Sequence, residues 1–308
     1  LPLGGRTSKG KAIVNILPIP TGVSIAAIMP VDRPEEDWDD LQIVFATSKG
    51  SVRRNLLSDF TNVKRNGKIA MKFEGDDENT RLINARICSE DDDVMLVTNS
   101  GRAIRFPVPE VRVFNSRNST GVRGVRLSNG DEVVSMSVIR HFEAESDERA
   151  SYLKMRRAMA GLADDAETPD EEEGNANSQL PPERYAQMSA AENLLLTITA
   201  KGLGKLSSSH DYPVRGRGGM GVTAWEKSMR GGEIVASFPV EMDDQIMLAT
   251  STGQSIRVPV DGISFRSRSA GGVKVFNTGA GETVVSVAWI ADQGDEDEDG
   301  DTAAPEQD

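Results

Sequence analysis

IVFATSKGSVRR, from Ile43 to Arg54, places a Thr-x-x-Gly turn between two short runs of strand-forming residues, and the chain repeats this arrangement three more times. The further copies align without gaps: VMLVTNSGRAIR from Val94, LLTITAKGLGKL from Leu195 and IMLATSTGQSIR from Ile246. Self-similarity at a period of about fifty residues is typical of repeat architectures. The repeat therefore decides the fold before any single residue does.

Two further blocks follow each copy. The second block is NGKIAMKF at Asn66, TGVRGVRL at Thr120, MGVTAWEK at Met220 and GGVKVFNT at Gly271. The third block is RLINARI at Arg81, DEVVSMSVI at Asp131, GEIVASFPV at Gly232 and ETVVSVAWI at Glu282. KGKAIVNIL from Lys9 and VSIAAIMPV from Val23 add a fifth copy of these two blocks only. Short blocks rich in β-forming residues and bounded by Gly, Asn, Asp or Ser predict strands.

The repeat predicts an all-β ring. A glycine three residues after the threonine tolerates positive φ and allows a tight hairpin. About four short strands per repeat indicate a propeller-like blade. We expect a closed or nearly closed ring of four-stranded blades over residues 1–290, in a chain that lacks an initial Met and is a fragment of a longer one.

Two acidic segments interrupt or follow this ring. Residues 141–191 separate the second and third repeats and are predicted to form a partly disordered insertion with one short helix within Glu148–Leu162. Residues 291–308 are predicted to form a disordered acidic tail. The chain has no apolar run long enough for a membrane span and no signal peptide, so we expect a cytoplasmic protein.

The net charge of −13 conceals an uneven distribution. From His141 to Glu192 there are 13 acids and 5 bases, and the last eighteen residues hold 9 acids and no base. The remaining chain is mildly basic. Within each repeat the acids collect around the third block, and the bases collect between the first and second blocks.

We predict that the nineteen bases between the first and second blocks form one band that contacts the phosphates of duplex DNA from exposed positions. Aromatic residues make up only 5% of the chain, so backbone contact is favoured over stacking on unpaired bases. The predicted DNA-binding residues are Arg53, Arg54, Lys64, Arg65, Lys68, Arg102, Arg105, Arg112, Arg117, Arg123, Arg126, Lys201, Lys205, Arg215, Arg217, Arg257, Arg266, Arg268 and Lys274.

The pattern VMLVTNSGRAIRF followed by STGVRGVRLSNGDEVVS closely resembles the repeats of the DNA gyrase A C-terminal domain. The resemblance implies a six-bladed β-pinwheel, with its first blade and part of the second absent from this sequence, that wraps duplex DNA for ATP-dependent negative supercoiling. It also implies an A2B2 holoenzyme, in which the partners are the N-terminal breakage-reunion domain and the ATPase-bearing gyrase B protein. RGRGGMG, from Arg215 to Gly221, resembles a degenerate copy of the family's wrapping motif, with Met220 in place of a lysine.

The chain carries no convincing catalytic or metal site. Gly216, Gly218 and Gly221 match a dinucleotide motif without the βαβ context that it requires, and the tail matches a Ca²⁺-loop pattern without flanking helices. Tyr185 has no helical cradle or carboxylate set, so we assign no catalytic residue. We expect no cofactor in this fragment, and ATP and Mg²⁺ on other parts of the holoenzyme. Two alternatives stay open: the related C-terminal domain of topoisomerase IV, and a propeller-type scaffold for protein partners.

Overall fold

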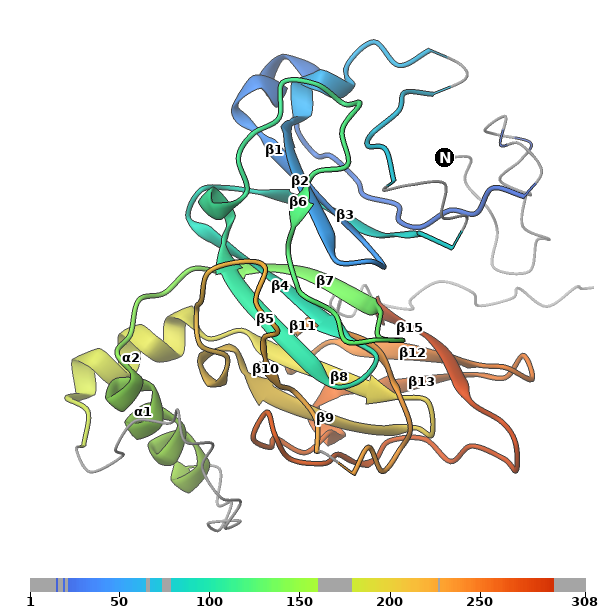
Figure 1. Cartoon of the computed structure of the whole chain (residues 1–308). Coiled ribbons are helices and arrows are strands. Elements are labelled where there is room, and N and C mark those ends of the chain that lie inside the picture. The colour runs from blue at the N-terminus through green and yellow to red at the C-terminus, as the bar shows by residue number, and fades with distance from the viewer. Residues whose placement is uncertain are drawn as a thin grey trace, which may run out of the picture.

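Four antiparallel blades follow one another around an axis in the computed structural model (Figure 1), as the repeat predicts. The structure describes residues 22–64, 67–73, 79–159, 179–226 and 228–290, with Asn15 and Ile19. The predicted acidic tail lies outside these residues, and so does nearly all of the early second block from Lys9.

The first block of each repeat is the central hairpin of a blade. In blade A, β1 (Gln42–Thr47) pairs with β2 (Ser51–Leu56). Gly50 has a φ of 81°, and the Ser51 amide donates to Thr47 Oγ1 at 3.2 Å, so the predicted Thr-x-x-Gly turn is confirmed. The equivalent hairpins are β4 (Asp92–Thr98) and β5 (Arg102–Pro107) in blade B, β8 (Leu194–Thr199) and β9 (Leu203–Ser208) in blade C, and β12 (Gln245–Thr250) and β13 (Ser255–Pro259) in blade D.

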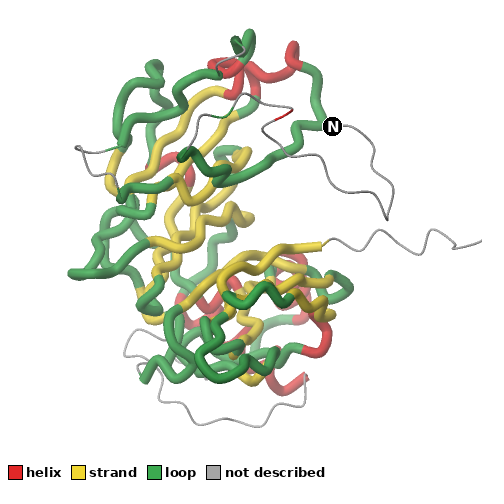
Figure 2. The backbone as a smooth tube through the Cα atoms, turned by 90° about the vertical axis from the view of Figure 1, so that its right-hand side faces the viewer, coloured by secondary structure: helices red, strands yellow, loops and turns green. Residues whose placement is uncertain are grey.

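The third block of each repeat adds a strand on the axial side of its own hairpin. These strands are β3 (Leu82–Cys88), β7 (Val133–Arg140), β11 (Ile234–Val240) and β15 (Val284–Ile290), paired with β1, β4, β8 and β12 respectively. Strand β7 contacts both β3 and β11, and β11 contacts β15, so these four strands face the axis. Figure 2 shows the strands inside and many of the connecting loops along one side.

The second block does not complete its own blade. It forms the short strands β6 (Val122–Arg123), β10 (Val222–Thr223) and β14 (Val273–Lys274), which pair with β2, β5 and β9 of the preceding blades. These exchange strands are shorter than the sequence predicts. Within the described part of the chain, blade D has only three strands, β13, β12 and β15.

Glycine makes the strand exchange sterically possible. Gly121 and Gly221 have φ of 90° and 68°, and a Cβ on them would lie 2.3 Å from Val52 O and 2.1 Å from Ala103 O. Only a residue without a side chain allows so close an approach between backbones. In the first repeat the equivalent Gly67 has a φ of 77° but nothing within 4 Å of the added Cβ.

Apolar side chains from neighbouring blades share a core. Val44 of blade A packs in one cluster with Leu96 and Phe106 of blade B. Similar clusters join blade B to blade C around Trp225 and blade C to blade D around Leu248. Stacking the blades buries both faces of the two middle sheets, so their hairpin strands are apolar with little alternation.

Residues 23–31, predicted as a strand, have no strand conformation in the structure. This segment copies the third block, but the sequence contains no preceding first block to supply its hydrogen-bonding partner. Val23 and Ile28 are exposed, whereas Met29 and Val31 pack against the outer face of blade A.

The insertion contains two helices rather than the one predicted. Helix α1 spans Ser146–Met159 and α2 spans Pro182–Ala191, while residues 160–178 between them lie outside the described part. His210 anchors both helices to blade C, since its Nε2 lies 2.8 Å from Met188 O of α2 and its ring packs edge-on against Tyr152 of α1. No described helix is long and apolar enough to cross a membrane.

The short 3₁₀ turns η3, η4, η5 and η6 end the four hairpins, and η2 precedes the first. Their bounds are Leu57–Phe60, Val108–Glu110, Ser209–Asp211, Val260–Gly262 and, for η2, Glu35–Asp40. After η4, η5 and η6 the chain runs back along the outer strand of the preceding blade, as the parallel bridges Arg54–Val113, Arg105–Val214 and Leu206–Phe265 show. Each of these return loops therefore lies on the preceding blade.

Gly221→Ala tests the strand exchange. Both Gly221→Ala and the matched control Gly67→Ala strain a left-handed backbone by about 1–2 kcal/mol. Only Gly221→Ala also forces a Cβ into the carbonyl of Ala103, which costs roughly 1–3 kcal/mol more. Urea unfolding of the two variants measures the difference, and equal losses would contradict the close backbone approach.

Candidate nucleic-acid interface

Five of the nineteen predicted DNA-binding residues are buried: Arg53, Arg54, Arg105, Lys205 and Arg268. Their predicted exposure is wrong, because the return loop of the next repeat covers the outer strand on which four of them lie. As placed here, these side chains hold the protein together.

Arg105 shows the arrangement most fully. Its Nε donates to Asp93 Oδ2 at 2.7 Å, and its Nη1 donates to Ser209 O at 2.8 Å in the following repeat. Nη2 donates to Arg140 O at 3.1 Å. His141 Nδ1 lies 2.7 Å from the other carboxylate oxygen of Asp93. One buried ion pair thus links the hairpin, the axial strand and the next repeat.

Arg53 and Lys205, which occupy the same column of the repeat, hold the return loops on blades A and C. Arg53 Nη1 donates to Ser119 O at 2.6 Å. Lys205 Nζ donates to three carbonyls, those of Ser267, Arg268 and Ala270, at 3.0, 2.5 and 2.6 Å. We call Arg53, Arg105 and Lys205 the clamp cations, because each joins an outer strand to the repeat that follows it.

Arg54 and Arg268 are also engaged inside the fold. Arg54 Nη1 donates to Gln42 Oε1 at 2.9 Å. Arg268 donates to Thr223 O at 2.8 Å, and its Nε lies 3.6 Å from Asp211 in a fully buried pair. Reversal of charge at Arg268 would therefore disturb the fold.

The remaining predicted bases are at the surface, apart from Arg65, which lies outside the described residues. The half-exposed members are Lys68, Arg102, Arg117, Arg217 and Arg266. The exposed members are Lys64, Arg112, Arg123, Arg126, Lys201, Arg215, Arg257 and Lys274.

The structure brings four of these arginines together where two return loops meet. Arg217 donates to Glu110 O at 2.8 Å and to Arg123 O at 3.1 Å. The Arg126 amide donates to Gly219 O at 2.8 Å, and the Gly218 amide to Gly124 O at 2.6 Å. We call Arg123, Arg126, Arg215 and Arg217 the rim cluster. It lies at the edge of the blades opposite the axial strands, beside exchange strand β6.

Acids around the third block bind backbone amides and bases within the fold. Asp131 accepts from the Ser100 amide at 3.2 Å. Glu132 pairs with Lys49 at 3.3 Å and with Arg81 at 2.8 Å, which joins blades A and B. Asp244 accepts from the Glu241 amide at 2.7 Å. These acids lie near turns at the ends of the axial strands, so they leave the outer rim basic.

The other reactive side chains do not form a site. Burial raises the pKa of the Cys88 thiol to about 12, so at neutral pH it stays protonated and a weak nucleophile. Tyr185 packs against Tyr152, with ring centroids 5.0 Å apart. The described residues contain no group of three or more His, Cys, Asp or Glu side chains placed to hold a metal ion.

Comparison with known families matches the four repeats. The family described as "DNA gyrase C-terminal domain, beta-propeller" matches residues 42–85, 92–140, 193–238 and 244–288. The chain belongs to the DNA gyrase C-terminal domain family. The matched segments leave out residues 141–192, which carry both helices of the insertion.

Curated relatives from the A chain of DNA gyrase cover nearly the whole sequence. The protein of Granulibacter bethesdensis is 45% identical and that of Rickettsia bellii 39%, over 98% and 97% of this chain. The Escherichia coli protein is 30% identical over 97%. The chain spans about a third of the length of these relatives, 33%, 32% and 28% respectively.

Two solved structures share the fold. A DNA gyrase A C-terminal domain superposes with a TM-score of 0.65 at 21% identity, covering 92% of this chain and 76% of that one. The C-terminal domain of a DNA topoisomerase IV superposes with a TM-score of 0.66 at 19% identity, covering 91% and 70%. The fold is therefore common to both kinds of domain.

Arg105→Met is expected to destabilise the domain by about 3–5 kcal/mol, because it leaves Asp93 as a buried charge without its main partner. Arg126→Met, at an exposed position of the rim cluster, should change stability by no more than about 0.5 kcal/mol. Urea unfolding of both variants tests this division. A small loss for Arg105→Met would mean that Arg105 is not a clamp.

Proposed function

We propose that this chain binds and wraps duplex DNA along its outer rim, without sequence preference, as a DNA gyrase A C-terminal domain. The observation that carries the proposal is the rim cluster, in which bases from two repeats converge at an exposed edge. In the complete enzyme the wrap would support ATP-dependent negative supercoiling by an A2B2 assembly in the cytoplasm.

Thirteen predicted bases remain at the surface, enough to neutralise several phosphates at once. They surround exposed backbone as well, since Gly216, Gly219 and Met220 are at the surface of the same loop. Arginine side chains and backbone amides together position a duplex through its phosphates and read no sequence. Repetition along the rim would continue the track from blade to blade.

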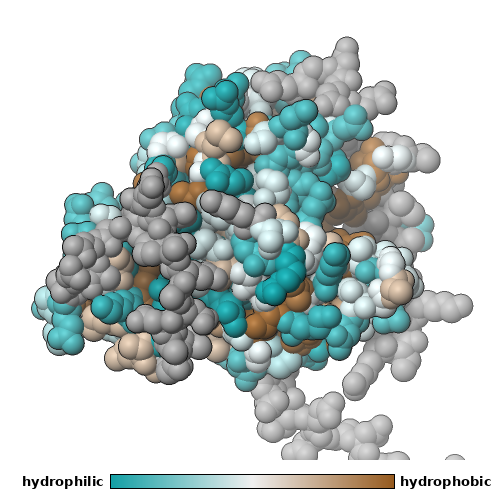
Figure 3. All heavy atoms as spheres, turned by 60° about the horizontal axis from the view of Figure 1, so that its bottom comes forward, coloured by the Kyte–Doolittle hydropathy of each residue, from teal (hydrophilic) through white to brown (hydrophobic). Residues whose placement is uncertain are grey.

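The alternatives make different demands on the surface. A topoisomerase IV C-terminal domain has the same fold, but the curated relatives that match this chain at 30–45% identity over nearly all its length are gyrase A proteins. A protein-binding scaffold would favour an apolar interface core with few charges. On the face in Figure 3 hydrophilic side chains predominate and apolar ones are scattered.

DNA affinity is expected to fall steeply with salt. Neutralising on the order of 6–10 phosphates would weaken binding about 10³- to 10⁵-fold between 50 and 200 mM salt. A scaffold with no polyanion track would show a flat profile. Fluorescence anisotropy with random-sequence duplexes measures the slope.

A single charge reversal separates rim contact from general electrostatics. Arg126→Glu should weaken DNA binding and lower the salt slope by about 0.9 for each lost phosphate contact. Arg86→Glu makes the same change of charge on β3, at the edge of blade A opposite β6, where the side chain is also exposed. Equal effects of the two variants would argue against a track on the rim.

Wrapping, as distinct from binding, is measured by topology. Closed circular DNA relaxed by a type I topoisomerase in the presence of the chain should retain supercoils after the protein is removed. Arg86→Glu should trap as many supercoils as the unmodified chain, and Arg126→Glu fewer. Binding without trapped supercoils would leave this chain a DNA-binding module that does not wrap.

A further inference from the structure

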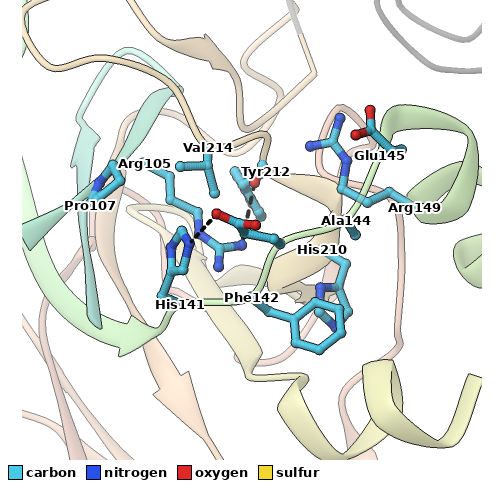
Figure 4. Close-up of a pocket in the computed structure, with 11 residues that line it drawn as sticks. Arg105, Pro107, His141, Phe142, Ala144, Glu145, Arg149, His210, Tyr212 and Val214 are labelled. Atoms are coloured by element: carbon cyan, nitrogen blue, oxygen red, sulfur yellow. Dashed lines mark hydrogen bonds and ion pairs between the residues drawn. The ribbon is translucent and has the colours of Figure 1, made fainter. Parts of the chain in front are cut away.

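A cavity of about 350 Å³ lies where the insertion meets blades B and C (Figure 4). Its walls come from the outer strand of blade B, the segment after β7, helix α1 and the return loop after η5. The side chains that matter here are Arg105, His141, Phe142, Arg149, Tyr212 and Val214. Because residues 141–192 fall outside the family match, part of this cavity belongs to the insertion alone.

Arg149 is the unusual member of this lining. Its Nε is buried and has no hydrogen-bond partner among the described residues. Burial lowers its pKa, and so does the positive charge of Arg105, while Asp211 is the nearby acid that opposes them. A buried guanidinium nitrogen without a partner is costly, and such groups commonly mark an ion or water that completes them.

The other charges around the cavity leave the charge of Arg149 poorly balanced. Arg105 is neutralised by Asp93, which also holds His141. The two acids of the lining, Glu143 and Glu145, are exposed, and Glu143 Oε1 lies 3.8 Å from His141 Nε2. In Figure 4 the guanidinium groups of Arg105 and Arg149 come from opposite sides of the cavity.

The rest of the lining indicates what kind of anion would fit. Phe142 and Val214 give apolar walls, and the volume exceeds that of a bare oxyanion. Apolar walls with a few convergent polar groups are typical of sites for organic ligands. Arginine binds phosphate oxygens well, because its planar guanidinium can donate two parallel hydrogen bonds.

We propose that this cavity is a phosphate-ester site, in which Arg149 is the anchoring donor and Phe142 and Val214 receive the organic part of the ligand. The phosphate comes either from the backbone of bound DNA or from a free nucleotide. Only the first source rests on the proposed function.

The test uses the whole chain with Arg149→Gln, and with Lys154→Gln as the control, because Lys154 is exposed on the same helix. One arm measures the melting temperature against adenosine monophosphate, with adenosine and chloride at matched ionic strength as blanks. The other arm measures affinity for a short duplex. Arg149→Lys, which keeps the charge but not the paired donors, should lose part of the response.

Loss of a hydrogen bond to a charged group should weaken binding roughly tenfold or more. Stabilisation by the nucleotide that disappears in Arg149→Gln but not in Lys154→Gln supports a free-nucleotide site. No response to the nucleotide, with duplex affinity lowered only in Arg149→Gln, supports the same site filled by DNA phosphate. If Arg149→Gln matches the control in both arms, the proposal is overturned.

Folding of the variants is not the obstacle, because Arg149→Gln removes a buried charge and should melt without ligand at or above the temperature of the unmodified chain. Duplex binding by the unmodified chain reports on the proposed function separately. Loss of that binding would leave the nucleotide arm intact.

Discussion

The fold depends on the close approach between each exchange strand and the outer strand of the preceding blade. A Cβ at Gly121, Gly221 or Gly272 would lie within 2.6 Å of a backbone carbonyl oxygen of that strand. Because each blade is completed by the next repeat, neighbouring blades are joined by backbone hydrogen bonds as well as by side-chain packing. The stability of a blade therefore includes an interface term from its neighbour, as in other repeat proteins.

The clamp cations follow from this exchange. A return loop that lies on the preceding blade brings carbonyl groups over its outer strand, and buried carbonyls require donors. Lys205 satisfies three of them, and Arg105 and Arg53 satisfy others. Part of the positive charge of each repeat is thus held inside the fold, and the rest is carried outward on the exchange strands and return loops.

Much of the fold was predictable from the repeat, because hairpins, turns and axial strands depend on local patterns within fifty residues. The exchange was not, since the second block reads equally well as a strand of its own blade. Arg126 and Arg105 are alike as letters, and only the neighbouring repeat decides which of them is covered. Helix α2 was missed because acidic composition dominated the interpretation of the insertion, although Pro182 followed by Tyr185, Met188 and Ala191 is a helical pattern. Arg149 was missed for the same reason.

Position in the array can therefore change the role of a cation without changing the residue. Arg54, Arg105 and Arg257 occupy one column of the repeat. The first two are buried beneath the following return loop, whereas Arg257 lies on β13, which no exchange strand pairs within the described residues, and it is exposed. At a covered blade this column holds the fold together, and at an uncovered edge it becomes part of the charged surface. Loss or addition of a neighbouring repeat would thus alter both the number of clamps and the number of bases free to meet a polyanion.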